Sequence, residues 1–169
     1  RPVQFNDIVL LTPTKKNNIV IQDVFSKQLD IPVAVKDTQN YFRTTEISIM
    51  MSLLKVINNP WQDIPLAAVL RSPIVGLNEI DLTKIRLMNT ASTYYESLIE
   101  FTAQEEPAPA NRKLQLKLIS FLDQLVHWRE LARRQPIVRL IWTIYEDTGF
   151  LYYVGGMSSG KQRKANLHA

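Results

Sequence analysis

Two kinds of hydrophobic pattern occur along this chain. Near the N-terminus, the short apolar runs 7–12 and 31–35 are rich in β-branched residues, which is typical of buried strands. Between them, residues 19–29 place apolar side chains at helical spacing. A strand, a helix and a second strand predict one βαβ unit, a small piece of parallel sheet. Since one unit cannot cover both faces of such a sheet, we expect it to belong to a larger sheet or to lie at its edge.

From residue 44 onward the pattern is helical. Apolar side chains recur at helical spacing, and breaks rich in proline, glycine and asparagine separate the segments. We expect helices at 44–57, 62–72, 78–88, 92–102, 112–134, 136–148 and 161–167. The aromatic segment 150–154 either completes this bundle or forms a short extended piece. The predicted fold is therefore mostly α with a small parallel β element.

The composition excludes several kinds of site. The 169 residues include no cysteine, which excludes disulfides and thiolate metal sites and favours a reducing, cytoplasmic setting. Only His127 and His168 supply imidazole, and neither has a second ligand at metal-binding spacing, so we expect no metal site. No apolar run is long enough to cross a membrane, so we expect no membrane partner. The first residue is Arg1 rather than Met, and we expect a piece of a longer protein.

Positive charge is concentrated in the second half of the chain. The net charge is +4, and residues 111–139 contain seven basic residues against two acids. Residues 155–169 contain three basic residues and no acid. This distribution suits a phosphate-rich partner, but charge alone favours a solvated helix face.

One glycine-rich stretch resembles a phosphate-binding P-loop. Residues 155–161 read G-x-x-x-x-G-K, but Gln162 stands where the loop needs a hydroxyl to bind Mg²⁺. We therefore interpret the stretch as a basic Gly/Ser loop that leads into a helix. At the start of that helix, Lys161, Arg163 and Lys164 are expected to hold a DNA phosphate.

A second basic group surrounds Trp128 in the segment 112–134. Arg129 and Arg133 beside this ring suit a patch that stacks on bases and contacts phosphates. Trp128 lies on the apolar stripe, however, so its periodicity favours core packing. The acids Glu105 and Glu106 lie in a Pro/Ala loop without a histidine partner, and we predict no catalytic residue in this chain.

Five segments together resemble the AddA (RexA) helicase/nuclease subunits, which are related to UvrD-type superfamily 1 DNA helicases. They read "NDIVLLTPTKKN" (6–17), "IPVAVKDTQNYFRTTEI" (31–47), "SLLKVINNPWQDIPLAAVLRSPIVGLNEIDLTKIR" (52–86), "FLDQLVHWRELAR" (121–133) and "TGFLYYVGGMSSGKQRKANL" (148–167). The resemblance implies that residues 1–43 are the edge βαβ portion of a second RecA-like lobe. Residues 44–169 would be a helical accessory subdomain with the start of the helix that returns to the lobe.

The resemblance also implies roles for single residues. Thr12 stands where relatives have an arginine near the ATP γ-phosphate, which makes it a nucleotide-proximal position. Phe42 and Glu46 match an F-F-x-x-x-E-I block close to the DNA track. Asn166 follows Arg163 in an R-x-x-N-L motif that begins the return helix.

Two further motifs lie between these blocks. Asn59, Pro60 and Asp63 match an N-P-x-x-D turn whose polar side chains are expected to cap helix ends. Residues 72–76, which end at Gly76, resemble in shortened form a loop through which relatives touch duplex DNA. The arginine inside that loop is missing here, and the preceding residue, Arg71, is the candidate to replace it.

The function implied is a non-catalytic part of an ATP-dependent DNA helicase/exonuclease subunit that processes double-strand breaks for recombinational repair. Its implied partners are DNA, as a duplex end or single strand, and a second subunit of the AddB (RexB) type. ATP and Mg²⁺ are implied for the longer protein, with no cofactor in this chain. The alternative is a helical scaffold that docks the partner nuclease subunit or the protein's own lobes. The residues predicted to contact DNA are Lys161, Arg163, Lys164, Arg71, Phe42, Arg129 and Arg133.

Overall fold

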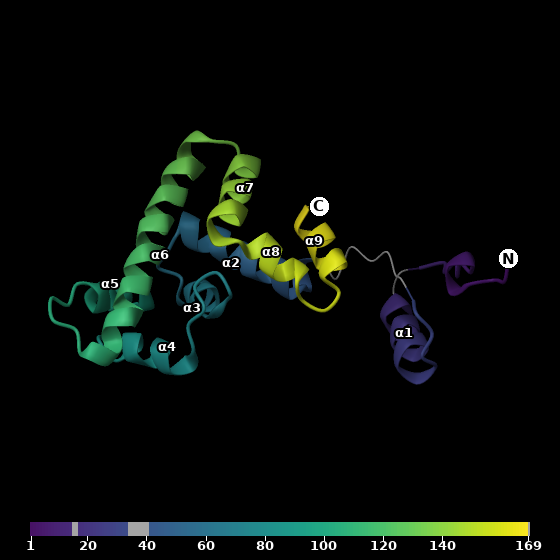
Figure 1. The fold of residues 1–169 in the computed structure, drawn as a ribbon, viewed down its shortest axis with the longest axis horizontal. Coiled ribbons are helices and arrows are strands. Elements are labelled where there is room, and N and C mark those ends of the chain that lie inside the picture. The colour runs from purple at the N-terminus through teal and green to yellow at the C-terminus, as the bar shows by residue number, and fades with distance from the viewer. Residues whose placement is uncertain (15–16, 34–40, 169) are drawn as a thin grey trace. The chain divides into compact units, whose positions relative to one another are not determined.

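The computed structural model describes residues 1–14, 17–33 and 41–168 (Figure 1). The chain divides into two compact units, Arg1–Arg43 and Thr44–Ala169. Below they are called the N-terminal unit and the helical unit.

The N-terminal unit contains helical turns. Its elements are η1 (Phe5–Asp7), α1 (Asn18–Asp23), the π-helical turn η3 (Val24–Gln28) and η4 (Tyr41–Arg43). The helix expected at 19–29 is therefore present as α1 and η3. No strand occurs among the described residues, so the predicted βαβ unit is wrong.

The apolar run 8–11 shows why the strand prediction fails. Side chains that were expected to be buried are between 63% and 87% exposed: Ile8, Val9, Leu10 and Leu11. A strand needs a neighbour to pair with its backbone N–H and C=O groups. The described part of this unit offers no such neighbour, so the run stays without regular structure. Of the second expected strand, residues 31–33 are likewise irregular, and 34–35 lie outside the described residues.

The helical unit contains α-helices joined by short loops. They are α2 (Thr45–Asn58), α3 (Asp63–Arg71), α4 (Glu79–Arg86), α5 (Tyr94–Thr102), α6 (Pro109–Arg134), α7 (Ile137–Thr148), α8 (Phe150–Gly155) and α9 (Gly160–His168). Every helix expected beyond residue 44 is present. Helix α6 starts three residues earlier than expected, because Pro109 has the fixed φ that suits a first helical position. The aromatic segment 150–154 is helical.

The core of the helical unit forms where α2 and α6 meet their neighbours. Helix α2 packs against α3, α6 and α9, and α6 also packs against α5 and α7. Trp128 on α6 is fully buried, and its Nε1–H donates to Asp147 Oδ2 on α7 at 2.8 Å. The core-packing interpretation of Trp128 is therefore confirmed. Its ring is not accessible for stacking on bases.

Local sequence signals set the ends of several helices. The Asn78 side chain accepts from the Asp81 backbone N–H at 2.9 Å and caps α4. Thr93 and Glu96 form the corresponding capping box of α5. Gly149 ends α7 with a φ of 63°, a left-handed conformation that glycine adopts without strain, and α8 begins directly after it.

Candidate nucleic-acid interface

The P-loop-like glycines serve the packing of α8 against α9. A Cβ atom on Gly160 would lie 2.1 Å from the backbone oxygen of Gly155, so neither helix could keep its place if that position had a side chain. Gly160 is buried, and α8 and α9 pack directly against each other. The spacing of the two glycines is thus explained by close helix approach. Helix packing therefore accounts for this spacing without a bound nucleotide.

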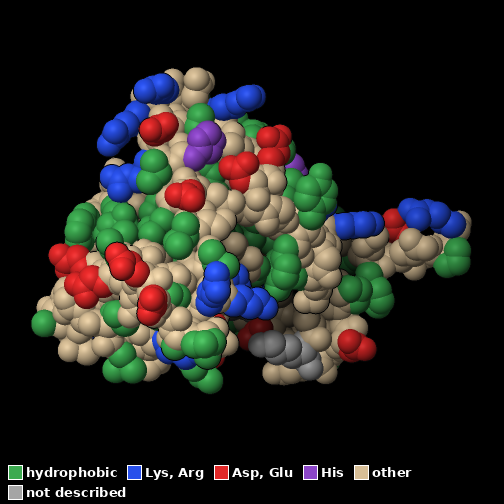
Figure 2. All heavy atoms as spheres, turned by 60° about the vertical axis from the view of Figure 1, so that its left-hand side comes forward, with side chains coloured by type: hydrophobic (Ala, Val, Ile, Leu, Met, Phe, Trp, Pro, Cys, Tyr) green, Lys and Arg blue, Asp and Glu red, His purple; other side chains and the backbone are tan. Residues whose placement is uncertain are grey.

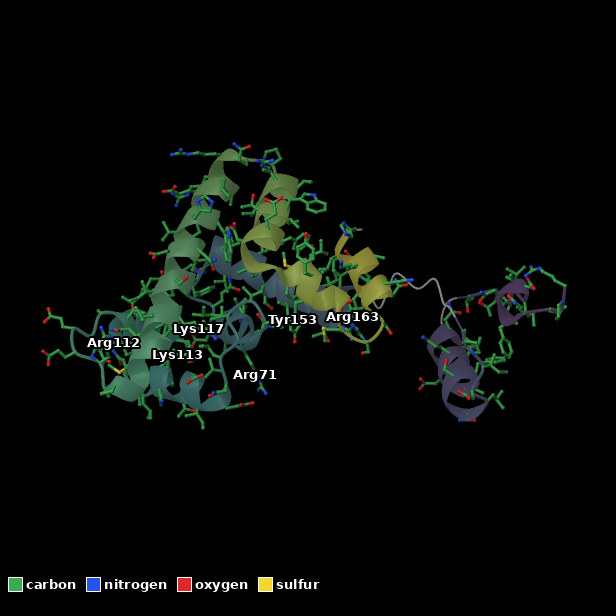
Figure 3. The ribbon with its side chains drawn as sticks, viewed as in Figure 1. Arg71, Arg112, Lys113, Lys117, Tyr153 and Arg163 are labelled. Atoms are coloured by element: carbon green, nitrogen blue, oxygen red, sulfur yellow. The ribbon has the colours of Figure 1, made fainter. Side chains whose placement is uncertain are left out.

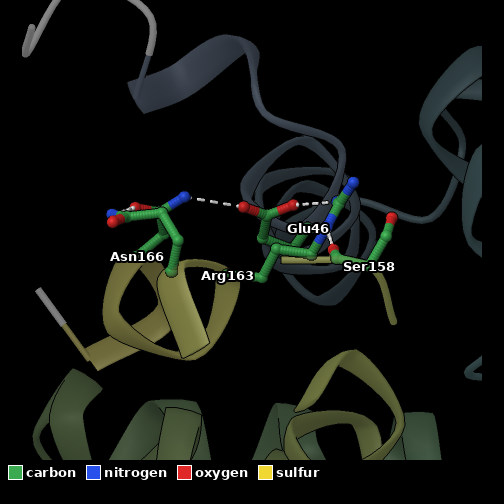
Figure 4. Close-up of polar contacts among 5 residues, drawn as sticks. Glu46, Ser158, Arg163 and Asn166 are labelled. Carbon is green, nitrogen blue, oxygen red and sulfur yellow. Dashed lines mark hydrogen bonds and ion pairs between the residues drawn. The ribbon is translucent and has the colours of Figure 1, made fainter. Parts of the chain in front are cut away.

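The buried carboxylate of Glu46 joins the first helix of the unit to the last (Figure 4). Its Oε2 accepts from Arg163 Nη1 at 2.7 Å, and its Oε1 accepts from Asn166 Nδ2 at 2.8 Å. The Arg163 Nε–H also donates to the backbone oxygen of Ser158 at 3.1 Å, which ties in the turn before α9. Glu46 is only 2% exposed. We call the three residues Glu46, Arg163 and Asn166 the clasp.

The clasp keeps Glu46 ionised. Burial opposes ionisation of this carboxyl, but the hydrogen bonds from Asn166 and from the backbone, together with the charge of Arg163, outweigh it. They hold the pKa of Glu46 below its usual value. Among the described residues, the Arg163 guanidinium thus pairs with the buried carboxylate of Glu46. This is a structural contact within the chain, whereas the sequence predicted that Arg163 contacts DNA.

The other two basic residues of α9 are placed differently. Lys161 is exposed and makes no ion pair or hydrogen bond with the described residues. Lys164 is half-buried, and its Nζ lies 5.4 Å from the centroid of the Tyr152 ring on α8. Both ammonium groups are therefore available to an anion.

The loop after α3 is held by hydrogen bonds, one of which comes from α6. Ser72 is buried, and its Oγ donates to the backbone oxygen of Val69 at 2.7 Å. Gly76 has a φ of 70°, which lets the chain turn back at this point. Lys117 Nζ on α6 donates to the Gly76 backbone oxygen at 3.0 Å. A lysine that is distant in sequence thus supplies positive charge beside this loop.

Arg71 and Lys113 extend this positive region. Arg71 ends α3 and forms an ion pair with Glu79, and both side chains are about two-thirds exposed (64% and 69%). Lys113 lies one turn before Lys117 on α6 and is exposed. In Figure 3 the labelled side chains of Lys113, Lys117 and Arg71 follow one another across the view, from α6 to the end of α3. We call these three residues the α3–α6 basic patch.

Hydrogen bonds hold the N-P-x-x-D turn in place, and of its two polar side chains Asp63 caps a helix. Asn59 Oδ1 accepts from the Trp61 backbone N–H at 3.1 Å, and Pro60 is buried. Asp63 Oδ1 accepts from the Tyr94 backbone N–H at 3.0 Å and so caps α5, a helix distant in sequence. Burial raises the pKa of Tyr94 to about 12, and Asp63 adds to the rise while Arg86 opposes it.

Arg129 and Arg133 line a groove whose other walls are mostly aliphatic. The groove has a volume of about 340 Å³ and lies between the ends of α2 and α6 and the start of α7. Its aliphatic lining residues are Leu54, Ile57, Ala132, Ile137 and Leu140. Figure 2 shows Lys and Arg side chains near the α6–α7 junction, at the top of the view, with acidic side chains close by. The predicted DNA contact of these two arginines stays a prediction, without an aromatic ring to support it.

The remaining predicted residues lie in the N-terminal unit. Phe42 is 65% exposed and contacts Tyr41 edge to face, with 5.1 Å between the ring centroids. Thr12 is exposed, and its Oγ1 donates to Asn18 Oδ1 at 3.3 Å. Within the described ranges, no group of three His, Asp or Glu side chains is placed to hold a metal ion. The same residues include no helix long and apolar enough to cross a membrane.

The comparison with known proteins identifies the family. The model of the UvrD-like helicase C-terminal domain matches residues 1–127. The chain belongs to this family. The chain is also similar over its whole length to the A subunit of the ATP-dependent helicase/nuclease from three bacteria. The identity is 57% for Enterococcus faecalis, 55% for Lactiplantibacillus plantarum and 53% for Latilactobacillus sakei.

These relatives are much longer than the chain. It spans 13%, 14% and 19% of their respective lengths. The predicted resemblance to AddA-type subunits is confirmed by these identities. The family match covers both the N-terminal unit and most of the helical unit, as far as the last turns of α6.

Sequence reasoning missed four exposed residues of the helical unit. Lys113 and Lys117 were included in the basic segment but not singled out, because only the fold places Lys117 beside Gly76. Tyr152 and Tyr153 were treated only as part of an aromatic segment that completes the bundle or forms a short extended piece. In the structure the buried residues of α8 are Phe150 and Val154, four positions apart, and the two tyrosines between them stay exposed.

Proposed function

We propose that the chain is the helical, DNA-contacting part of an ATP-dependent helicase/nuclease subunit that processes DNA double-strand breaks. Its role is to hold DNA beside a motor located elsewhere in a longer protein. The proposal rests chiefly on the 57% identity, over the whole chain, to the helicase/nuclease protein of Enterococcus faecalis. That relative's name supplies the helicase and nuclease activities, which we extend to this chain.

Two groups of cations support a DNA-contacting role. The first is the α3–α6 basic patch of Arg71, Lys113 and Lys117, where Lys117 donates to the Gly76 backbone oxygen. The second is the pair Lys161 and Lys164 on α9. Such contacts recognise phosphates and not base sequence, so we expect affinity to fall as salt rises.

The same proposal assigns cofactors and partners to the longer protein. It would use ATP and Mg²⁺, bound by parts of that protein outside this chain. It would act in the cytoplasm on duplex ends or single-stranded DNA, and it would assemble with a second nuclease subunit of the AddB type.

A DNA titration tests the proposal. The chain is titrated against a fluorescently labelled hairpin with a single-stranded tail, at about 50 mM and 200 mM salt. We expect binding that weakens steeply between the two concentrations. Replacing Lys161 and Lys164 by Ala should weaken binding, and the salt slope should fall by about one for each phosphate that no longer meets a lysine.

The control must leave the clasp intact, so Arg163 is not a suitable target. Lys55→Ala on α2 removes an exposed positive charge outside both groups and should leave affinity nearly unchanged. Absence of salt-dependent binding by the unmodified chain would contradict the proposal. If Lys55→Ala and the α9 double variant lost the same affinity for each charge removed, the effect would come from net charge and not from a site on α9.

A further inference from the structure

Two neighbouring tyrosines on α8 expose their rings. Tyr152 is 76% exposed and Tyr153 is 53% exposed. Neither hydroxyl group makes a hydrogen bond with the described residues. Two other tyrosines of the helical unit behave differently: Tyr94 donates to the Leu82 backbone oxygen and Tyr145 to that of Leu167, and both rings are buried. Packing therefore accounts for Tyr94 and Tyr145 but not for the α8 pair.

Lys164 reaches from α9 across the end of α8 to the first of these rings. A Cβ atom on Gly155 would lie 2.3 Å from Lys164 Cε, so it is the missing side chain at this position that leaves room for the lysine. The ammonium group ends 5.4 Å from the Tyr152 ring centroid, within the range of a cation–π contact. An aromatic ring and a cation thus share one exposed surface.

The α9 side of this surface carries basic residues and no acid. Residues 155–169 contain no Asp or Glu. Lys161, in the first turn of α9, is exposed and has no partner among the described residues. Arg163 contributes less, because the clasp occupies its guanidinium. Figure 3 places Tyr153 on α8 and Arg163 on the neighbouring α9.

Exposed aromatic rings beside lysines match the chemistry of unpaired bases on a phosphate backbone. Each unstacked base offers a π-face to a tyrosine, and its phosphate can contact a lysine. Bases inside a duplex are stacked on one another and expose only their edges, so the rings would have little to bind. Single-stranded DNA is therefore the form that uses both kinds of group.

We propose that Tyr152, Tyr153, Lys161 and Lys164 form a stacking platform for single-stranded DNA. This inference rests on the proposed function and refines it, because it assigns the single-stranded part of the substrate to α8 and α9. The lysines attract any DNA. The tyrosines distinguish a single strand from a duplex.

Binding of two probes tests the platform. The chain and its Tyr152→Ala/Tyr153→Ala variant are titrated with a labelled oligothymidylate and with a blunt hairpin that has no tail. We expect the variant to lose about fivefold or more in affinity for oligothymidylate, since loss of base–aromatic stacking weakens binding by this order. Its affinity for the blunt hairpin should change less than about twofold, and its salt slope should be unchanged, because no phosphate contact is removed.

Two matched variants separate stacking from other effects. Tyr152→Phe/Tyr153→Phe keeps the π-faces and should retain affinity for oligothymidylate. Lys161→Ala/Lys164→Ala should weaken binding of both probes and lower the salt slope. Circular dichroism of each variant checks that the helices are intact.

The outcomes distinguish failure of the platform from failure of the proposed function. If the unmodified chain binds neither probe, the proposed function fails and the platform fails with it. If it binds both probes with normal salt dependence, and the Tyr-to-Ala variant loses affinity equally for both or for neither, only the platform is overturned.

Discussion

Apolar residues are exposed in one segment of the N-terminal unit and buried on α6. In the N-terminal unit, the run 8–11 is exposed and has no regular structure. On α6, the apolar stripe that includes Leu118, Leu125 and Trp128 is almost fully buried. Both segments carry large apolar side chains. They differ in what lies beside them.

The difference lies in where each element finds its hydrogen-bond partners. A helix makes its backbone hydrogen bonds within itself, so α6 needs only a covering surface, and α2, α5 and α7 provide it in the same unit. A strand needs a second strand to pair with, and the described residues provide none. Apolar sequence therefore predicts burial reliably only when the partner is in the same chain.

The largest effect should come from the core of the helical unit. Trp128→Ala removes a fully buried ring and its hydrogen bond to Asp147, so we expect the free energy of unfolding to fall by about 3–5 kcal/mol. Urea denaturation followed by circular dichroism measures it. Trp142→Ala, at a ring that is 43% exposed, is the control and should cost much less. Similar losses for the two variants would mean that Trp128 is not central to the core.

The clasp should have the next largest effect. Glu46→Gln keeps the shape of the side chain but leaves Arg163 without its counter-charge, and we expect a loss of about 1–3 kcal/mol. Breaking a fully buried ion pair costs more than this, but the Arg163 side chain is 26% exposed, so water can solvate part of its charge. The same denaturation experiment at pH 7 measures it. A variant as stable as the unmodified chain would contradict the assigned role.

The clasp also predicts how stability depends on pH. The pKa of Glu46 in the folded state is lower than its ordinary value of 4.5, so the unfolded chain binds the proton more tightly. The stabilisation is present above pH 4.5 and is lost as the pH falls through the lower folded pKa. Glu46→Gln should remove this part of the acid sensitivity. The free energies of unfolding of the two proteins, measured by urea denaturation between about pH 3 and pH 7, should differ most near pH 7 and become similar near pH 3.

A smaller effect is expected at the cap of α5. Asp63→Ala leaves the Tyr94 backbone N–H without its acceptor, which should cost about 1 kcal/mol. Asp123→Ala is a suitable control, since Asp123 is exposed on α6 and caps no helix. An equal cost for both variants would show that Asp63 is not a cap.

The smallest effect tests the N-terminal unit directly. Leu11→Asn changes a side chain that is 87% exposed, and we expect the stability of the helical unit to change by less than about 0.5 kcal/mol. All three tryptophans, Trp61, Trp128 and Trp142, lie in the helical unit, so their fluorescence reports on that unit alone. A loss above about 1 kcal/mol would mean that the apolar run is buried against a partner after all.

Much of the helical unit could be predicted from the sequence, because its signals are local. The Asn78 and Thr93 caps, the break after Asn58 and the stripe around Trp128 each act within a few residues. Gly149 separates α7 from α8 through a local effect too, its left-handed backbone conformation. The strand at 7–12 was wrong, because strand formation depends on a partner outside the local window.

The candidate site was harder to predict, because it depends on long-range contacts. Arg163 was expected at a phosphate, yet it pairs with Glu46, 117 positions earlier. The only signal was the i, i+3 spacing of Arg163 and Asn166, which places both side chains on one helix face. Lys117 and Gly76 are 41 positions apart, and no local pattern connects them. Charge and periodicity locate a basic helix, but the fold decides which of its cations stay available.

The contact of Glu46 with Asn166 has a consequence for how such a unit can be built into a larger molecule. It brings the start of the first helix and the end of the last to the same place, although 120 positions separate them. A segment with adjoining ends can be inserted into a surface turn of a host domain without pulling the two sides of that turn apart. The host then keeps its own architecture, and the inserted helices can change in evolution almost independently of it.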